Sequence, residues 1–388
     1  MENGKFISNM IGFTKVPSPC YVLIETLLEN NLKLLKHVID SADINLLCSL
    51  KGYSMWETFP LIGKYLNGGA ASSLNEAKLI FDEMGVRAHT YCPVYIEETF
   101  DEILEYSSHI TFNSLSQYQK FYHVVKKYGK KISCGLRINS EYSEIKVDIY
   151  NPATPLSRLG ITVEHFGEKL PEGIEGLHFH LLCEQDSYVL ERVLAKVEEK
   201  FQHLLKQCKW INIGGGHLIT HKNYDVEHLM SLLKSFKSRY PNVNIILEPG
   251  GAIGWETGFL VSKVLDIIEK KDISIAMLDV SFSAHMPDTL EMPYKPDILG
   301  ATDPQKGKPV YRFGGLTCLA GDFIGDYSFE KPLKVDDIIV FDDQIHYTFV
   351  KTNFFNGVQH PSIGKIDKDN NFVMIRKFSH EDFKNKLS

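Results

Sequence analysis

Lys51 stands at the end of the apolar run 46–52, in the segment Cys48-Ser-Leu-Lys-Gly52. A lysine at the end of a buried strand points into the space between strand ends, where lost hydration lowers its pKa and makes its amine a nucleophile. Most lysines at strand ends are simply solvated. Lys51 is therefore a candidate nucleophile that needs support from its neighbours.

Glu248 ends another apolar run, in Leu247-Glu-Pro-Gly-Gly251. A carboxylate in this place can hydrogen-bond a protonated ring nitrogen and keep the ring electron-poor, which stabilises a neighbouring carbanion. The alternative is a glutamate in an ordinary β-turn, because Pro-Gly is common turn chemistry.

Two glycine turns follow neighbouring predicted strands, Gly214-Gly215-Gly216 and Gly250-Gly251. Successive glycines let backbone N–H groups approach an anion closely, and barrels often bind phosphate after their last two strands. The pattern matches neither a P-loop nor a dinucleotide fingerprint. We expect an anion site here, with a plain tight turn as the alternative.

His178 and His180 alternate in Leu177-His-Phe-His-Leu181 and therefore share one face of a strand. Two such histidines can ligate zinc, but no further ligand stands at suitable spacing, so no metal is expected. An imidazole stacked on a flat aromatic cofactor is the functional interpretation. A hydrogen-bonded core histidine is the alternative.

Eight apolar runs alternate with segments of helical periodicity. The fold that this alternation predicts would bring the candidate residues together. The predicted strands span 46–52, 67–73, 89–94, 109–113, 133–139, 173–180, 210–216 and 244–251. Between them, residues such as Leu190, Val193 and Leu194 recur at helical spacing. Eight such repeats favour a (β/α)8 barrel over an open doubly wound sheet, with function at the carboxyl ends of the strands.

The pattern changes after residue 258, where short β-like runs lie between turns rich in Pro, Gly and Asp. These runs span 274–279, 308–313, 338–341, 347–351 and 371–376. We expect an α/β protein with a barrel at 25–258 and a second, mostly antiparallel β domain at 259–388. The strand-like segment at 18–23 suggests that residues 1–24 join the second domain.

Charge and composition argue against two classes of protein, those that bind nucleic acids and those that span membranes. The 388 residues carry a net charge of −7, which argues against a nucleic-acid-binding face. No window is apolar enough for a membrane span, and no membrane partner is expected. The seven cysteines form no CxxC pair, and an odd number fits a reducing compartment, so a cytoplasmic location is expected.

Taken together, these residues resemble the fold-type III pyridoxal-phosphate (PLP) decarboxylases, the group that includes ornithine, arginine and diaminopimelate decarboxylases. The resemblance covers nearly the whole chain from Ser18 onward. Within the group, it is strongest to members that act on carboxylated polyamines. The segments that carry it span 69–74, 157–160, 177–184, 279–294 and 314–322.

The resemblance implies PLP as the cofactor, with Lys51 as the Schiff-base lysine. It implies that His180 stacks on the ring and that Glu248 faces the ring nitrogen. The implied cofactor-binding residues are Lys51, Arg158, His180, Gly215, Gly216, Glu248, Gly250, Gly251 and Tyr347. Of these, the glycines and Tyr347 correspond to phosphate-binding elements.

The same resemblance implies a homodimer with shared active sites, in which Cys318 reaches the neighbouring site. Cys318 is expected to return a proton after CO2 leaves, with Lys51 as the second choice. The substrate would be a small polyamine-like amino acid, whose charged tail requires carboxylates. The candidate carboxylates are Asp279, Asp288, Glu291 and Asp322.

One departure and several alternatives remain. Ornithine and diaminopimelate decarboxylases usually have an arginine directly after Glu-Pro-Gly, whereas this chain has Gly251. The phosphate must then be held more by backbone amides and Tyr347, or by another cationic side chain that the sequence does not identify. Arg158 stands where many relatives have lysine; it either reaches the cofactor or braces the residues around Glu248, and Arg137 is a similar supporting candidate. Diaminopimelate decarboxylase is the alternative activity, although the segment 279–294 lacks the arginines that a distal carboxylate needs.

Three more distant possibilities differ in what they require of the site. Alanine racemase would pair the ring nitrogen with an arginine rather than with Glu248. A non-catalytic PLP carrier would keep Lys51 but would have no use for Cys318. A metal-dependent barrel hydrolase would require a ligand set that the sequence does not show.

Overall fold

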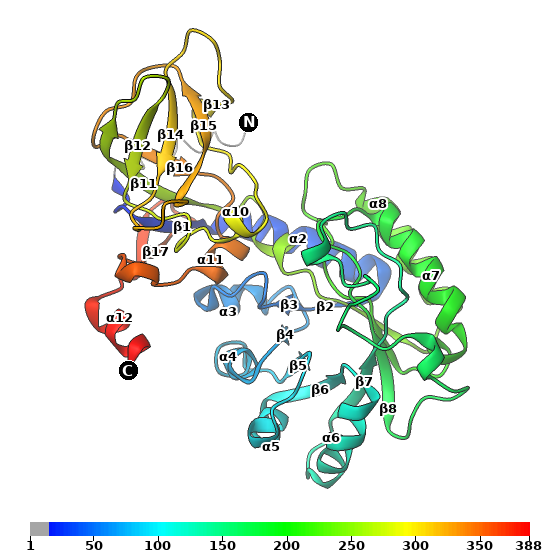
Figure 1. Cartoon of the computed structure of the whole chain (residues 1–388). Coiled ribbons are helices and arrows are strands. Elements are labelled where there is room, and N and C mark those ends of the chain that lie inside the picture. The colour runs from blue at the N-terminus through cyan, green and yellow to red at the C-terminus, as the bar shows by residue number, and fades with distance from the viewer. Residues whose placement is uncertain (1–14) are drawn as a thin grey trace. The chain divides into compact units, whose positions relative to one another are not determined.

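The computed structural model describes residues 15–388 (Figure 1). Residues 1–14, which the sequence analysis assigned to the second domain, lie outside the described residues. The described chain forms two compact units. The barrel unit contains Asn31–Ile253, and the sheet unit contains the described residues up to Asn30 together with Gly254–Ser388.

The barrel unit is built on a nine-stranded sheet in the order β2-β10-β9-β8-β7-β6-β5-β4-β3. Every neighbouring pair in it is parallel. Because β2 and β3 are two pieces of one extended segment separated by Leu47, the two ends of the sheet meet and the ring has eight strand positions. The strands are β2 (Asn45–Leu46), β3 (Cys48–Ser49), β4 (Gly69–Ala71), β5 (Ala88–Tyr91), β6 (Ser107–Phe112), β7 (Ser133–Arg137), β8 (Ile174–His178), β9 (Trp210–Asn212) and β10 (Asn244–Leu247). The predicted (β/α)8 barrel is thereby confirmed.

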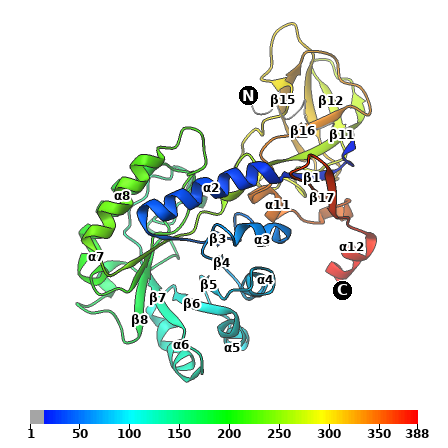
Figure 2. The same ribbon diagram turned by 180° about the vertical axis from the view of Figure 1, so that it is seen from behind.

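Helices lie outside this ring of strands in both views (Figures 1 and 2). They are α3 (Phe59–Ile62), α4 (Leu74–Met84), α5 (Glu97–Tyr106), α6 (Leu115–Lys127), α7 (Ser187–Leu205) and α8 (Val226–Arg239), with α2 (Glu25–Ala42) before the first barrel strand and α9 (Gly251–Gly254) after the last. Side chains that accept a backbone N–H begin four of them, at Ser73, Ser114, Asp186 and Asp225. Helix α7 buries Leu190, Val193 and Leu194, as their helical spacing predicts.

Trp210 fills part of the barrel interior and explains two glycines on the neighbouring strands. A Cβ at Gly135 would lie 2.3 Å from the indole of Trp210, and one at Gly176 would lie 2.1 Å from it. The indole Nε1 donates to Ser133 Oγ at 2.8 Å, which satisfies its buried N–H. The side chain of Trp210 therefore fills the space beside these strands, below their carboxyl ends.

The sheet unit contains a mixed sheet in the order β13-β15-β14-β12-β11-β1-β17-β18, with β16 paired to β11. Its strands are β1 (Cys20–Ile24), β11 (Gly258–Ile268), β12 (Ser274–Leu278), β13 (Ala301–Thr302), β14 (Val310–Gly314), β15 (Phe323–Phe329), β16 (Ile338–Phe341), β17 (Ser362–Ile366) and β18 (Phe372–Arg376). Most pairs are antiparallel, and β1 joins the sheet between β11 and β17. Cys20, Val22 and Ile24 on β1 pack in one core cluster with Phe259 and Val261, which follows the two-residue period of strands.

One predicted strand of this unit is wrong. Residues Tyr347–Lys351 form the short helix α11 instead of a strand. Their aromatic and β-branched side chains favour strands only when a sheet neighbour is present. Here Thr348 Oγ1 donates to Asp288 Oδ2 at 2.8 Å, a contact with another segment that sequence patterning does not reveal.

The remaining helices of the sheet unit are short. They are α10 (Asp288–Glu291) and α12 (His380–Leu387), while the 3-10 turns of the chain are η2 (Trp56–Thr58), η3 (Asp148–Tyr150), η4 (Val163–His165) and η5 (Phe355–Gly357). Among the described residues, no helix is long and apolar enough to span a membrane.

Candidate active site

The polar residues singled out in the barrel unit stand just beyond the carboxyl ends of its strands. Lys51 follows β3, His180 follows β8, Gly214–Gly216 follow β9, and Glu248 follows β10. The strands end a few residues earlier than the sequence analysis expected, so these residues lie in the connecting loops. Because parallel strand ends meet at one rim, this is the face where barrels place their chemistry.

Lys51 is reached by solvent, yet protein atoms surround it closely. Desolvation, and secondly the positive charge of Arg137, lower the pKa of its ammonium, while Glu248 and Glu76 oppose this shift. The positive charge of Arg137 and the negative charges of the two glutamates therefore all act on the Lys51 amine. A larger share of Lys51 is therefore neutral, and nucleophilic, than for a lysine in water.

The loops carrying Lys51 and Glu248 approach so closely that only glycine fits between them. A Cβ at Gly52 would lie 2.8 Å from the backbone N of Gly251, and one at Gly250 would lie 2.8 Å from the backbone O of Ser49. The first and last strands are also joined by the hydrogen bond from Leu47 N to Leu247 O, at 2.8 Å. Glycine is thus required to bring the amine and the acid to the same part of the rim.

Glu248 is a nearly buried carboxyl group with its own partners. Oε1 accepts a hydrogen bond from Asn212 Nδ2 at 2.5 Å, and Oε2 lies 3.8 Å from His178 Nε2. Burial raises the pKa of Glu248 to about 7, although Asn212, Arg137 and Lys51 favour its charged form. A carboxyl poised near neutrality suits an acid that pairs with a protonated ring nitrogen.

His180 is held in one orientation and one tautomer. Its Nδ1 accepts the backbone N–H of Gly215 at 2.9 Å, and desolvation keeps its pKa well below the usual value. The ring is therefore neutral, with the proton on Nε2. His178 is also neutral through desolvation, but it lies lower on β8 and packs edge-on against Tyr91, with ring centroids 5.2 Å apart.

The glycine loop after β9 has the conformation of a backbone cradle. Gly214 and Gly216 have φ of +76° and +85°, in the left-handed region that favours glycine. At Gly215, a Cβ would lie 2.2 Å from the backbone O of Glu248. The loop therefore lies against the Glu248 segment and cannot carry side chains, as an anion-binding turn requires.

Arg137, at the end of β7, is a supporting residue in the middle of the barrel rim. Its side chain is buried; Nη2 donates to the backbone O of His180 at 3.2 Å, and its guanidinium lies 4.8 Å from the centre of the Tyr91 ring. Its positive charge acts on Lys51, Glu248 and His180 alike. It thus links the three side chains electrostatically.

Arg158 has an exposed side chain on a loop that is anchored to the same region. Asn113 Nδ2 donates to the backbone O of Arg158 at 2.8 Å, and Asn113 Oδ1 accepts from Gly160 N and from the Tyr91 hydroxyl. The charge of Arg158 also acts on Tyr91. The loop is fixed, while the guanidinium itself remains reachable from solvent.

The sheet unit holds the other predicted site residues, and two of its carboxylates accept three or four hydrogen bonds each. Asp279 accepts from Ser18 Oγ, Ser262 Oγ and Lys263 N at 2.7–2.9 Å. Asp322 accepts four hydrogen bonds at 2.6–3.0 Å, from residues 282, 283 and 317. Both are buried. These contacts give each carboxylate a role in holding loops, and a substrate-binding role for them stays a prediction.

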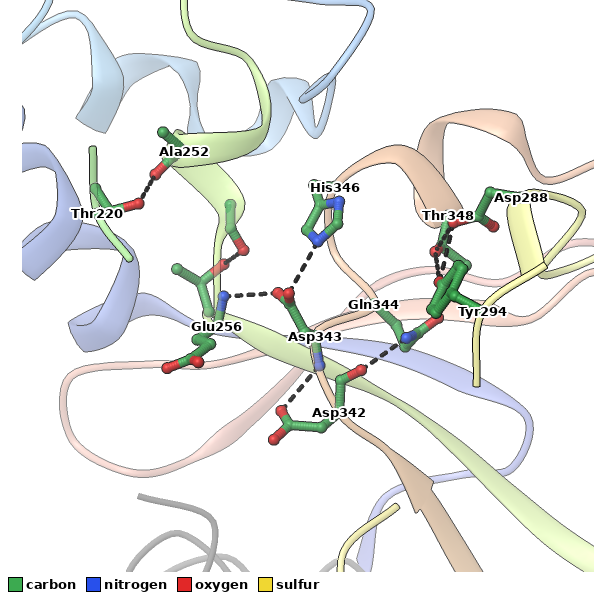
Figure 3. A network of polar contacts seen from close by, with 12 residues as sticks. Thr220, Ala252, Glu256, Asp288, Tyr294, Asp342, Asp343, Gln344, His346 and Thr348 are labelled. Carbon is green, nitrogen blue, oxygen red and sulfur yellow. Dashed lines mark hydrogen bonds and ion pairs between the residues drawn. The ribbon is translucent and has the colours of Figure 1, made fainter. Parts of the chain in front are cut away.

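Asp288 and the two sequence neighbours of Tyr347, His346 and Thr348, take part in the polar contacts drawn in Figure 3. Asp288 Oδ2 accepts from Thr348 Oγ1 at 2.8 Å and from the Tyr294 hydroxyl at 3.1 Å. On the other side of Tyr347, His346 Nε2 lies 3.1 Å from Asp343 Oδ2. The half-buried Tyr347 is thus placed by neighbours that are fixed on both sides.

Glu291 and Cys318 are the exposed members of this group. Glu291 forms an ion pair with Lys351 of α11. Cys318 is the exposed cysteine among the seven, all of which are free thiols; Cys183 is half-buried and the other five are buried. Surface placement leaves the Cys318 thiol available to a neighbouring molecule.

The residues of the barrel rim fit pyridoxal phosphate. The pKa of the Lys51 amine is lowered by desolvation, the acid of Glu248 is buried and acts on that amine, and the ring of His180 is neutral. The glycine loop presents backbone N–H groups with no Cβ in the way. An amine, an acid, a flat ring and an anion cradle are the four groups that this cofactor requires. In the part of the chain that the structure describes, no cluster of three or more His, Cys, Asp or Glu side chains could hold a metal ion.

Comparison with known proteins places the chain in a family. The family model described as pyridoxal-dependent decarboxylase, C-terminal sheet domain, matches residues 37–344. The chain belongs to the pyridoxal-dependent decarboxylases, and is a decarboxylase of their fold.

Individual relatives are similar over almost their full length. A carboxyaminopropylagmatine decarboxylase of Synechocystis is 46% identical, with 96% of each chain covered. A carboxynorspermidine/carboxyspermidine decarboxylase of Campylobacter jejuni is 44% identical, with 96% of this chain and 98% of the relative covered. The crystal structure of carboxynorspermidine decarboxylase from Campylobacter jejuni, complexed with norspermidine, has a TM-score of 0.89 at 43% identity, covering 96% of this chain and 100% of that one.

A diaminopimelate decarboxylase from Helicobacter pylori has a TM-score of 0.80 at 16% identity, covering 97% of this chain and 98% of that one, which shows the shared fold.

The structure adds two residues that sequence reasoning missed. Asn212 holds both Glu248 and the glycine loop, since its Oδ1 accepts from Gly214 N at 2.9 Å. A polar residue within the buried run Trp210-Ile-Asn212 was the available indication. Glu76 acts on Lys51, and burial raises its pKa, but in sequence it is indistinguishable from a capping residue of α4.

Proposed function

We propose that this protein decarboxylates carboxynorspermidine or carboxyspermidine, giving norspermidine or spermidine, with pyridoxal phosphate as cofactor. The observation that carries the proposal is the joint placement of Lys51 and Glu248, an amine of lowered pKa beside an acid of pKa about 7. The substrate class is supported by the 44% identity to a relative of that specificity. A cytoplasmic location fits seven free cysteines.

Pyridoxal phosphate supplies an aldehyde that takes up an amine and a ring that absorbs the electrons left when CO2 departs. Lys51 provides the amine that holds it. The carboxylate of Glu248 would accept a hydrogen bond from the protonated ring nitrogen. His180 would offer a flat neutral face, and the N–H groups of the Gly215–Gly216 and Gly250–Gly251 turns would hold the phosphate. Tyr347 stays a predicted phosphate contact and Arg158 a predicted cofactor contact.

Proton return needs an acid near the carbon that loses CO2. Cys318 is our choice because its thiol is exposed on a loop, whereas Lys51 is the second choice on the barrel rim. The charged tail of the substrate needs carboxylates. Asp279 and Asp322 already accept three and four hydrogen bonds, so Asp288 and Glu291 keep more accepting capacity. We therefore assign the tail contacts first to Asp288 and Glu291.

A homodimer with shared sites is part of this proposal. The loop that carries Cys318 also exposes Leu316 and Leu319, at 39% and 47% of their surface, and Phe323 beside it is 44% exposed. Clustered apolar side chains around an exposed thiol are typical of a surface that a partner covers. A second copy of this chain is the partner that would place Cys318 at an active site.

Carboxyaminopropylagmatine is a second candidate substrate, because the relative that decarboxylates it is 46% identical. Diaminopimelate is less favoured: the relatives with that activity are 23–24% identical over 55–73% of the chain. The sequence 279–294 also offers no arginine for a second carboxylate.

The experiment is CO2 release from a panel of these substrates and ornithine, with Lys51→Ala as the inactive control. We expect a carboxylated polyamine to give a kcat/KM at least about tenfold above that of diaminopimelate, because a site built for charged tail amines rejects a carboxylate there. Preferred turnover of diaminopimelate or ornithine would contradict the proposed substrate class.

A further inference from the structure

The loop between β14 and β15 carries Cys318 at its tip and is closed by its own backbone. Gly315 N donates to Asp322 O at 2.8 Å, and Asp322 N donates to Leu319 O at 3.0 Å. These bonds close the loop, but neither of them involves Cys318 itself. The position of the thiol therefore depends on contacts with other segments.

The Asp322 carboxylate fastens the loop to residues 282–283. Oδ1 accepts from the backbone N–H groups of Phe282 and Ser283 at 2.7 and 3.0 Å, and Oδ2 accepts from Thr317 N and Oγ1 at 2.9 and 2.6 Å. Gly315 makes room for it, because a Cβ there would lie 2.5 Å from Oδ2. A buried carboxylate with four donors holds the residue before Cys318 firmly.

Asn356 contacts the cysteine directly. Its Oδ1 accepts the backbone N–H of Cys318 at 2.7 Å. Asn356 has φ of +60°, a left-handed conformation that asparagine tolerates better than most residues. The unusual backbone aims the side-chain amide at the tip of the Cys318 loop.

The turn that carries Asn356 is fastened to the same segment as Asp322. Asn353 N donates to Ala284 O at 2.8 Å, Asn353 Nδ2 donates to Ser283 O at 3.3 Å, and Asn353 Oδ1 accepts from Phe355 N at 2.7 Å. Residues 282–284 thus serve as a common base. Cys318 is held from one side by Asp322 through Thr317 and from the other by Asn356.

We propose that Asn356 is a positioning residue for the Cys318 thiol, acting through the Cys318 backbone N–H. The inference rests on the proposed function, in which Cys318 returns a proton to the substrate carbon. Proton transfer requires hydrogen-bond reach, and a displacement of about 1 Å in a reacting group can cost up to about 100-fold in rate. A thiol on a loop tip meets this requirement only if the tip is fixed.

The first test is the alkylation rate of Cys318 by iodoacetamide in the ligand-free protein, measured by peptide mass spectrometry with the buried cysteines as internal reference. Asn356→Gly removes the amide without backbone strain, since glycine suits a positive φ. We expect alkylation to become about fivefold faster, as the loss of one hydrogen bond releases the tip. Asn356→Asp keeps a hydrogen-bond acceptor. Its alkylation rate should stay within about twofold of the wild-type rate when both rates are expressed per thiolate.

Asn370→Gly is the matched control, because Asn370 has φ of +63° in the turn between β17 and β18. It should leave Cys318 alkylation unchanged. An unchanged rate in Asn356→Gly, or an equal change in Asn370→Gly, would overturn the proposal. Because no turnover is needed, this result is independent of whether the proposed substrate is correct. Asn356→Ala repeats the test if the glycine variant is poorly folded.

The second test is a double-mutant cycle in the PLP-loaded enzyme. Asn356→Gly should lower kcat by about fivefold with KM unchanged, and should add nothing in a Cys318→Ala background, because the two residues act through one thiol. Recovery of kcat in Asn356→Asp is the expected rescue. Equal losses in both backgrounds would show that Asn356 acts elsewhere and would overturn the proposal.

Discussion

Asn212 donates a hydrogen bond from Nδ2 to Oε1 of Glu248, and with its other side-chain atom it accepts the backbone N–H of Gly214. One buried amide therefore joins the acid after β10 to the glycine loop after β9. The bond favours the ionised form of Glu248, whose pKa burial has raised to about 7. Asn212 thus sets both the charge of the acid and the shape of the anion cradle.

Replacing Asn212 with alanine should raise the pKa of Glu248 further, because the ionised form loses a hydrogen bond. Less of the acid is then charged at neutral pH, and kcat/KM should fall by about tenfold, with part of the loss recovered at higher pH. Asn244→Ala, at the exposed start of β10, is the control. A pH profile parallel to that of the wild type would contradict this role.

Replacing Glu248 with glutamine should raise the free energy of unfolding of the ligand-free protein at neutral and higher pH. At acidic pH the substitution should leave it unchanged. The folded-state pKa of about 7 lies above the ordinary glutamate value of 4.5, so the folded state binds the proton more tightly. Stability is therefore lost as pH rises from about 4.5 to 7 and stays lower beyond it. We expect the variant to gain on the order of 1–3 kcal/mol in free energy of unfolding at pH 8 and nothing near pH 4. Urea unfolding at both pH values measures the difference, and an equal effect at both would contradict the assigned pKa.

The same Glu248→Gln variant should lose most of its turnover. Glutamine keeps the size of the side chain but cannot counter a positive ring nitrogen, so we expect kcat to fall by about 100-fold or more. Cofactor absorbance reports whether binding survives. Full activity with a neutral side chain would show that Glu248 does not face the ring.

Cys318→Ala should slow turnover by about 10²-fold or more while the cofactor stays bound, since proton transfer is lost and the amine of Lys51 is untouched. Ala320→Ser, at another exposed position of the same loop, is the control for loop changes. Steady-state CO2 release together with absorbance separates the two effects. Unchanged kinetics in Cys318→Ala would exclude the thiol as the proton donor.

The barrel, and the places of Lys51 and Glu248 at its rim, could be predicted from sequence because both follow local rules. Parallel buried strands appear as continuous apolar runs, and Lys51 and Glu248 stand where two of those runs end. The glycine repeat likewise predicted a turn after β9, where Gly214 and Gly216 have positive φ. Residue type and place in the pattern were sufficient for these positions, whereas the cofactor and substrate roles came from the family resemblance and stay predictions.

The sheet unit was less predictable because its contacts are long-range. The run at Tyr347–Lys351 has strand-forming residues but forms α11, which contacts Asp288 some 60 residues away. Asp322 lies close in sequence to Cys318, but two of the four hydrogen bonds that it accepts come from the backbone N–H groups of residues 282 and 283, some 40 residues away; its contact with substrate stays a prediction. Such partners are set by tertiary packing, which spacing does not encode.

The central claim is that the amine of Lys51 carries the cofactor. The most direct measurement is reconstitution with pyridoxal phosphate, reduction with borohydride, and peptide mapping by mass spectrometry. The label should lie on the peptide containing Lys51, and Lys51→Arg should show neither label nor visible absorbance. A label on a different lysine, or a colourless wild-type protein, would contradict the account.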